Sequence, residues 1–209
     1  MKRHIDNFDL SHVYDEYDKS EIDLEHLLKR IFLTNGRLPH HQRILCWFPR
    51  YLEHFVNFHE TMMNQEDILP ITWKYYIAIM AVSCYECEYL LKILEEQFLL
   101  YGGDVKWLTD GLKIVDKKLQ MISELNEVMA FRPWILNSMH IEALTQSATK
   151  EKKLNWSIPE IVQGSVILAS YHALCCLIFG SGIKDDIDTA VNFTQGGPCK
   201  YKGFVDSKS

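Results

Sequence analysis

The sequence predicts an all-α fold, and three observations support this prediction. Apolar side chains recur at steps of three and four residues along most of the chain, which is the spacing of one helical face. Glycine or proline interrupts this pattern at intervals that suit helix ends. No segment alternates apolar and polar residues between hairpin turns, as a half-buried strand would. We therefore expect a helical bundle in which two long helices form the core.

The first predicted helices precede a polar break in the chain. Apolar residues in 22–32 share one helical face, and Gly36 ends this helix. An aromatic and apolar block follows at 41–63, in which Pro49 is expected to kink or split the helix. The polar break at 64–70 then separates this block from the rest of the chain.

The first long core helix is expected to begin at Thr72, as its N-cap, and to run to about Leu100, with Gly102 ending it. Cys84 and Cys87 fall inside this helix in a C-x-x-C arrangement. Residues three apart share a helical face, so the two sulfurs could approach each other. The pair is open to two interpretations: a redox pair, or two small apolar core residues.

The second long core helix has the clearest start signal in the chain. Ser157 and Glu160 can form a capping box, and Pro159 suits the first turn because its missing N–H costs little there. This helix is expected to run to about Phe179 and to end at Gly180. Shorter helices are predicted between the two long ones, at 106–108, 112–129 and 138–149.

Composition excludes some classes of function. The 209 residues carry a net charge of −6 and no dense Lys/Arg run, so we expect no nucleic-acid partner. Polar residues interrupt the apolar segment 161–178, which we interpret as a buried core helix and not a membrane span. No apolar signal-peptide core lies in the first ten residues, so the six cysteines are expected to be thiols.

The chain is expected to form one domain with polar ends. Residues 1–20 are polar and predict a flexible N-terminal segment. The helical pattern then occupies residues 21–183. Residues 184–209 turn polar and contain glycine and proline, which is typical of a linker or disordered tail.

A reactive thiol in the C-x-x-C pair would need help to ionise. Inside one long helix, both cysteines would lie far from the positive helix start, whose influence fades within the first turn. The carboxylates of Glu86 and Glu88 would raise the pKa of a neighbouring thiol. A histidine from elsewhere in the chain would have to act as the base. The candidates are His54, His59, His140 and His172.

His172 and Cys175 form a second pair with a spacing of three. The pair could place a base beside a thiol, or His172 could be a core histidine that a backbone carbonyl satisfies. A zinc site would need both cysteine-bearing helices to meet, whereas structural zinc usually lies on loops with paired C-x-x-C motifs. No glycine-rich phosphate loop follows a strand. We therefore expect no metal and no cofactor.

Several stretches of the chain resemble the sestrin family. The signature is WKYYIAIMA at 73–81, followed by CEYL at 87–90. Further stretches agree in the same order, and together they cover about 24–183. They are residues 36–38, 102–108, 124–126, 132–134, 156–157, 171–172 and 179–183.

The resemblance implies an all-α domain similar to bacterial alkylhydroperoxidases, termed AhpD-like, and a set of site residues. It places the catalytic cysteine at Cys87 and a tyrosine at Tyr89, and it calls for a histidine at the position of Leu94. A leucine side chain cannot accept the proton of the cysteine thiol or relay a proton to the product, so the resemblance implies an impaired reductase. The second cysteine of the bacterial enzymes corresponds to Leu90, but Cys84 could resolve a sulfenic acid on Cys87.

The resemblance also implies a biological role. Sestrins restrain growth under oxidative stress and amino-acid shortage, acting through the GATOR complexes to inhibit the TOR kinase complex, in cytoplasm and nucleus. A C-terminal domain that binds leucine and contacts the GATOR partner is expected to be missing from this chain.

Three hypotheses follow. The first is a regulator that is not an enzyme and acts through protein contacts, which Leu94 favours. The second is a weak alkylhydroperoxide reductase centred on Cys87, with Tyr89 as hydrogen-bond donor and Cys84 as resolving thiol. The third is a structural half that needs a partner domain.

Overall fold

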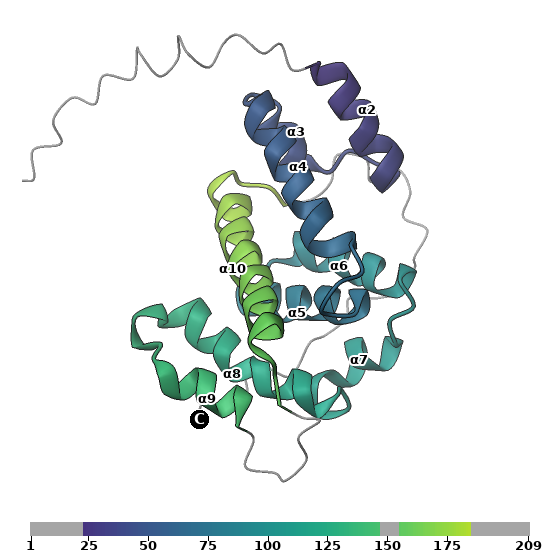
Figure 1. Cartoon of the computed structure of the whole chain (residues 1–209). Helices are drawn as coiled ribbons and strands as arrows, with labels where there is room; N and C mark the ends of the chain where they lie inside the picture. The colour runs from purple at the N-terminus through teal and green to yellow at the C-terminus, as the bar shows by residue number, and fades with distance from the viewer. Residues whose placement is uncertain (1–22, 147–154, 185–209) are drawn as a thin grey trace, which may run out of the picture. The chain divides into compact units, whose positions relative to one another are not determined.

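The computed structural model describes residues 23–146 and 155–184, and all regular elements in these ranges are helices (Figure 1). The all-α prediction is therefore confirmed for this part of the chain. The predicted flexible segment and, apart from Lys184, the predicted tail lie outside the described residues. Contacts divide the chain into two compact units, with the boundary in the sequence between Val56 and Asn57, and each unit is described by itself.

The first unit contains α2 (Leu24–Asn35), α3 (His40–Leu45) and the first part of α4 (Pro49–Asn64). The Asp23 side chain caps α2 by accepting from the backbone N–H of His26 at 2.9 Å. Gly36 ends the helix with a left-handed φ of 68°, as predicted. The predicted split at Pro49 is also confirmed, because α4 begins there.

The second unit is built around α5 (Ile71–Ser83) and α10 (Ile158–Gly180), which pack against each other. Figure 1 shows α10 crossing α5, with α8 (Lys117–Phe131) beside them. Every residue of α5 from Lys74 to Val82 is buried. The remaining elements of this unit are α6 (Glu88–Leu100), α7 (Val105–Asp110), η1 (Gly111–Lys113), η2 (Pro133–Ile135) and α9 (Ser138–Thr145).

The predicted single helix from Thr72 to about Leu100 is wrong. The N-cap is Pro70, and the helix breaks into α5 and α6 at the turn 84–87. Within this turn Glu86 has φ 52°, a left-handed conformation that non-glycine residues adopt at a cost. The backbone N–H of Tyr85 donates to Val82 at 3.1 Å, and that of Glu86 to Ser83 at 3.2 Å. The second helix therefore has its own N-terminus, which the sequence did not reveal.

The start of α10 follows the sequence prediction. Ser157 Oγ accepts from the backbone N–H of Glu160, and the Glu160 carboxylate accepts from the backbone N–H of Ser157 at 2.7 Å. By length and composition α10 could cross a membrane, but half of its most apolar stretch is buried. It packs against α5 and α8, which is the arrangement of a core helix.

A buried lysine ties the loop before α5 to the core. Lys74 is fully buried and pairs with Asp67 at 2.7 Å. Its Nζ also donates to the carbonyl of Gln65 at 2.6 Å. Gln163 of α10 donates to Asp67 at 2.6 Å and accepts from the backbone N–H of Leu69 at 3.0 Å. These bonds satisfy a charge that burial alone would make costly.

Candidate functional site

Cys87 occupies the N-cap of α6 and not the interior of a helix. Its φ of −80° and ψ of 83° form a tight turn, in which the backbone N–H of Glu88 donates to the carbonyl of Glu86 at 3.0 Å. The backbone N–H groups of Tyr89 and Leu90 in the first turn lower the pKa of the Cys87 thiol, although its side chain makes no hydrogen bond that caps the helix. The helix start therefore does act on this thiol, and the prediction that it would lie too far away is wrong.

A second thiol, from α10, meets Cys87. The Cys175 thiol hydrogen-bonds to the Cys87 sulfur, and the two side chains are 0% and 1% exposed. This hydrogen bond is the main cause that lowers the pKa of Cys87 from its ordinary value, with the two backbone N–H groups adding to it against the effect of burial. The same contact and burial raise the pKa of Cys175. Cys87 is thus the thiol that ionises first, and Cys175 is the donor.

Cys84 lies at the C-cap of α5, where its sulfur accepts from Nδ2 of Asn126 at 3.2 Å. Burial raises the pKa of Cys84 to about 11. The thiol therefore stays protonated at neutral pH, and its hydrogen-bond partner is an amide and not Cys87. Its proposed role as the resolving thiol stays a prediction.

Asn126 links three helices from a fully buried position on α8. Its Nδ2 also donates to the carbonyl of Met80 at 3.0 Å, so both amide hydrogens are used. Its Oδ1 therefore accepts from Nε2 of His172 on α10, 2.9 Å away. Burial lowers the pKa of His172 to about 4, so the ring is neutral at pH 7. Of the two interpretations of this histidine, the core role fits the structure, although its partner is an amide side chain and not a backbone carbonyl.

The other candidate bases are engaged elsewhere. His59 Nε2 lies 2.9 Å from the hydroxyl of Tyr171, and burial lowers the pKa of His59 to about 4. His140 completes the capping box of α9 with Asn137. His54 is exposed and belongs to the other unit. The groups that act on the Cys87 thiol are Cys175 and two backbone amides, and none of them is an imidazole.

Comparison with known proteins identifies the family. Residues 6–203 match the sequence model of the family described as PA26 p53-induced protein (sestrin). The chain belongs to the sestrin family. It is 36% identical to mouse Sestrin-3 over 160 residues, covering 77% of this chain and 32% of that protein. It is 38% identical to mouse Sestrin-1 over 156 residues, 75% of this chain and 31% of that protein. The chain thus spans about a third of the length of these sestrins.

A solved structure supports the fold of this sestrin. An uncharacterised peroxidase-related protein from Ralstonia eutropha, with an alkylhydroperoxidase AhpD core, superposes with a TM-score of 0.58. The match covers 76% of this chain and 82% of that one, at 14% sequence identity. At this identity the likeness concerns the fold alone, and it confirms the prediction of an AhpD-like helical domain.

The sestrin site residues can now be placed in the structure. Tyr89 is buried in the first turn of α6, and its backbone N–H lowers the pKa of Cys87. Leu94, at the position where the resemblance calls for histidine, is 3% exposed and part of the apolar core. Within the described residues, no histidine is among the groups that set the pKa of Cys87. The groups that favour its thiolate are a second thiol and two backbone N–H groups.

The turn above the sestrin thiols is held by Tyr85. Its hydroxyl donates to the carbonyl of Ala130 at 3.1 Å, and its ring packs edge-on against His172 with centroids 5.4 Å apart. Glu86 and Glu88 on either side of Cys87 are exposed. Cys87 therefore lies directly beneath a surface turn.

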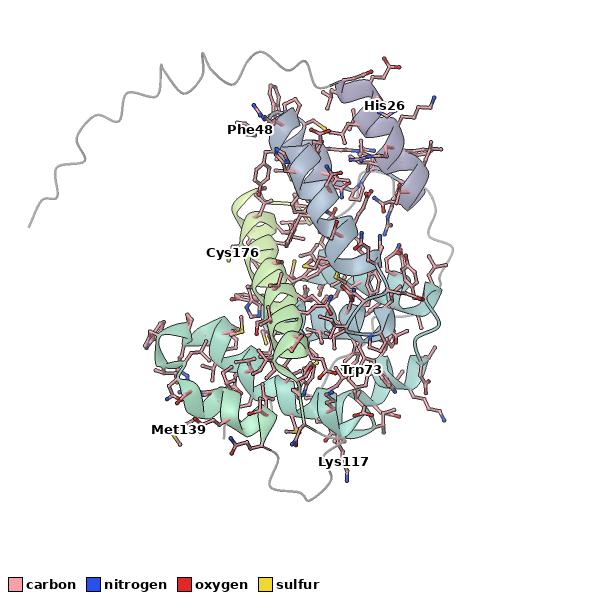
Figure 2. The ribbon with its side chains drawn as sticks, viewed as in Figure 1. His26, Phe48, Trp73, Lys117, Met139 and Cys176 are labelled. Atoms are coloured by element: carbon pink, nitrogen blue, oxygen red, sulfur yellow. The ribbon has the colours of Figure 1, made fainter. Side chains whose placement is uncertain are left out.

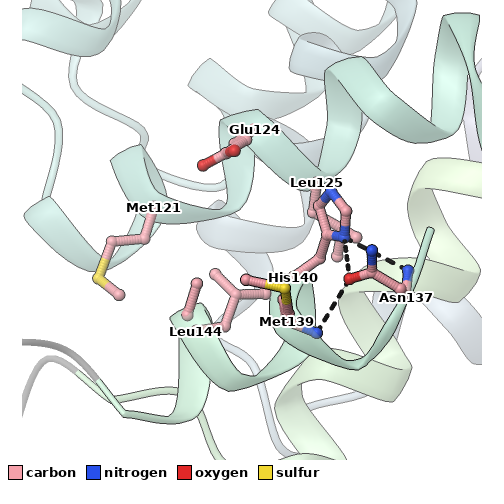
Figure 3. Close-up of a pocket in the computed structure, with 8 residues that line it drawn as sticks. Met121, Glu124, Leu125, Asn137, Met139, His140 and Leu144 are labelled. Carbon is pink, nitrogen blue, oxygen red and sulfur yellow. Dashed lines mark hydrogen bonds between the residues drawn. The ribbon is translucent and has the colours of Figure 1, made fainter. Parts of the chain in front are cut away.

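A cavity of about 400 Å³ lies elsewhere, between α8 and α9 (Figure 3). Figure 3 shows His140 and Asn137 hydrogen-bonded to each other at its edge. Its lining contains no thiol, and it is formed by Met121, Glu124, Leu125, Asn137, Met139, His140, Ala143 and Leu144. Across the two described ranges, no cluster of three or more histidine, cysteine or acidic side chains could hold a metal ion.

Proposed function

We propose that this chain is a stress-responsive regulator of the sestrin type that restrains TOR-complex signalling through protein contacts. Membership of the sestrin family supports this proposal. The observation that carries it is the enclosed site: Cys87 is 1% exposed, and buried Leu94 stands where a proton acceptor would be needed. A thiol in this setting is poorly equipped for turnover, which leaves recognition as the better-supported role.

The end of α8 and the segment after it offer a surface for such contacts. Large apolar side chains are exposed there close together in the chain, which is typical of a site that binds another protein. Trp134 is 77% exposed, and Met139 points away from the helices (Figure 2). The exposed apolar side chains of this surface are Phe131, Trp134, Ile135, Leu136 and Met139.

The partners in this proposal are proteins of the GATOR and TOR pathway, in cytoplasm and nucleus. This chain matches about a third of the length of its sestrin relatives. We therefore assign leucine binding and the main GATOR contact to the remaining part of such proteins, and a supporting contact to this helical part.

The test is to express the full chain in cells that lack their own sestrins. We expect a small decrease in the phosphorylation of a TOR-complex substrate during amino-acid withdrawal, and weak co-purification of GATOR components, because this helical part is assigned only the supporting contact. Cys87→Ser should keep both effects, whereas Trp134→Ala should weaken them. Trp47→Ala is the matched control, because Trp47 is 85% exposed but lies on the other unit. An inert wild-type chain, or loss of both effects in Cys87→Ser, would contradict the proposal.

A second candidate function is a weak alkylhydroperoxide reductase that uses Cys87. The observation that favours it is the position of Cys87 at the N-cap of α6, where backbone N–H groups and Cys175 lower its pKa. Tyr89 would serve as hydrogen-bond donor and Cys84 as resolving thiol. Hydroperoxide consumption with a thiol reductant tests this function. Turnover that is lost in Cys87→Ser but kept in Cys176→Ser would establish it, and equal background rates in all three proteins would reject it.

A further inference from the structure

We infer that Cys87 and Cys175 form a reversible disulfide when the chain meets a hydroperoxide, so that the N-terminus of α6 becomes covalently linked to α10. This inference goes beyond the proposed regulatory role. It requires a single oxidation event, so it holds whether or not the chain turns over hydroperoxide as an enzyme. Its substrate is a small hydroperoxide, either hydrogen peroxide or an alkyl hydroperoxide.

The contact between the two thiols is the first argument. Cys87 and Cys175 come from elements far apart in the sequence, but the turn that holds Cys87 packs on α10, where the Tyr85 ring lies 5.4 Å from that of His172, one helical turn before Cys175. Both thiols are buried there, and each shifts the pKa of the other through a side-chain contact. A disulfide requires the sulfurs to close to about 2.05 Å. Cys87 can supply this movement because it lies in the short turn between α5 and α6, whereas Cys175 sits within α10.

Access is the second argument. Cys87 is enclosed, but its neighbours in the chain, Glu86 and Glu88, are exposed. The cover over the thiol is thus one turn of backbone. Such a turn opens locally at a lower free-energy cost than a packed helix does. A small hydroperoxide can reach Cys87 through this opening without disrupting the contact between α5 and α10.

The environment of Cys84 excludes it as the preferred partner. Its sulfur is held by Asn126 at 3.2 Å, within the buried network that also includes Met80 and His172. Leaving this position would strand an amide hydrogen of Asn126. Cys175 has no comparable commitment, because its hydrogen-bond partner is Cys87 itself.

The chemistry balances with the hydroperoxide as the sole oxidant. The Cys87 thiolate attacks the terminal oxygen of the hydroperoxide, so an S–O bond forms, the O–O bond breaks, and the alkoxide leaves and takes a proton from water. The Cys175 sulfur then attacks the sulfenic sulfur of Cys87. The S–S bond forms, the S–O bond breaks, and hydroxide leaves with the Cys175 proton as water. Two thiols are oxidised and one hydroperoxide is reduced to an alcohol.

The first step prepares the second. The hydrogen bond to Cys87 is the largest cause that raises the pKa of Cys175, followed by burial and the Cys87 charge. Conversion of Cys87 to a neutral sulfenic acid removes its charge and the thiolate acceptor. Oxidation of Cys87 therefore removes the two causes that Cys87 itself exerts on the Cys175 pKa, while burial remains, beside the sulfur that Cys175 must attack.

The test is peptide mapping of the full chain after brief treatment with tert-butyl hydroperoxide, followed by alkylation without reductant. Proteolysis after glutamate separates Cys84 from Cys87, because Glu86 lies between them. We expect a cross-link between the Cys87 peptide and the peptide that contains Cys175, and its loss on reduction. Cys175→Ser should abolish the cross-link, and a dimedone-type probe should then trap Cys87 as a sulfenic acid.

Matched variants make the outcome decisive. Cys176→Ser should keep the cross-link, since Cys176 is exposed on the outer side of α10 (Figure 2), and Cys84→Ser should keep it too. The glutamate-cleaved peptide 161–209 also contains Cys176 and Cys199, so fragmentation of this peptide between Cys175 and Cys176 assigns the linked sulfur in the wild type, even if a variant fails to fold. A Cys84–Cys87 disulfide, a cross-link that survives in Cys175→Ser, or no disulfide at all in the treated wild type would each overturn the inference.

Discussion

Asn126 Oδ1 and His172 Nε2 lie 2.9 Å apart and join α8 to α10 inside the core. The same asparagine reaches α5 through the carbonyl of Met80 and the sulfur of Cys84. One amide side chain therefore satisfies polar groups from two neighbouring helices and fixes the tautomer of a buried histidine. Cys84 accepts a hydrogen bond from Asn126, and Cys175 lies one helical turn after His172. The environment of both thiols therefore depends on these hydrogen bonds.

Removal of the Asn126 side chain should destabilise the fold. We expect Asn126→Ala to lower the free energy of unfolding by about 2–4 kcal/mol, because it leaves a buried carbonyl and a buried imidazole N–H without partners. Urea denaturation measures the change. Asn137→Ala is the control, since it removes an exposed helix cap worth about 1 kcal/mol. Equal losses in the two variants would contradict the importance of the buried network.

The chain should lose stability in mild acid. The pKa of His172 is about 4 in the fold, below its unfolded value of about 6.5. Between these values the unfolded state binds more protons, so the stabilising effect is complete above about pH 6.5 and is lost as pH falls toward 4. The loss from His172 is at most about 3 kcal/mol. His59 acts in the same direction, because burial also lowers its pKa to about 4.

Glu95 opposes this trend in part, because burial and then Glu96 raise its pKa to about 7. Its contribution is present below about pH 4.5 and is lost as pH rises through 7. The clean measurement is therefore a difference. His172→Gln keeps a side-chain N–H for Asn126 but cannot titrate, so its unfolding free energy should change less between pH 7 and 5 than that of the wild type. Parallel curves for the two proteins would show that His172 is not the titrating group.

The start of α10 should depend on its capping box. We expect Ser157→Ala to cost about 1 kcal/mol, because the backbone N–H of Glu160 loses its acceptor. Thermal unfolding measures the effect. Ser170→Ala is the control within the same helix, because Ser170 Oγ donates to the carbonyl of Val166 in the helix interior and its loss should be nearly neutral. The capping role would be refuted if both variants unfolded like the wild type.

The close approach of α10 to α8 should require Gly164. A Cβ atom at this position would lie 2.9 Å from Cδ1 of Ile122, which is fully buried. We expect Gly164→Ala to cost about 1–3 kcal/mol through overpacking. Ile122→Val should reduce that cost, so the two changes together should be less harmful than their sum. Strict additivity in a double-mutant cycle would argue against this contact.

The sequence predicts the helix boundaries that depend on local chemistry. Gly36 ends α2 and Ser157 begins α10, because left-handed glycine and a capping box act within one turn of the chain. The break at 84–87 carries no such signal, since Cys84, Tyr85, Glu86 and Cys87 include neither glycine nor proline. Tertiary contacts, such as those of Tyr85 with α8 and α10, override the local preference there.

The candidate site shows the same division. Cys87 and Tyr89 could be named from the resemblance, and Leu94 could be recognised as a departure from it. The meeting of Cys87 with Cys175 could not be predicted, because it depends on where α10 crosses the turn between α5 and α6. The error over the helix boundaries also changed the expected electrostatics, since it placed Cys87 far from any helix start, whereas Cys87 is the N-cap of α6.

The burial of α5 has a consequence for how the protein is made. The nine residues from Lys74 to Val82 are covered on all sides, and α10, which covers them most extensively, begins only at Ile158. On the ribosome, α5 is therefore translated seconds before the segment that shields it. During that interval the apolar surface of this helix is exposed on the nascent chain and can aggregate with other chains. We therefore expect a chaperone to bind the nascent chain at this stage.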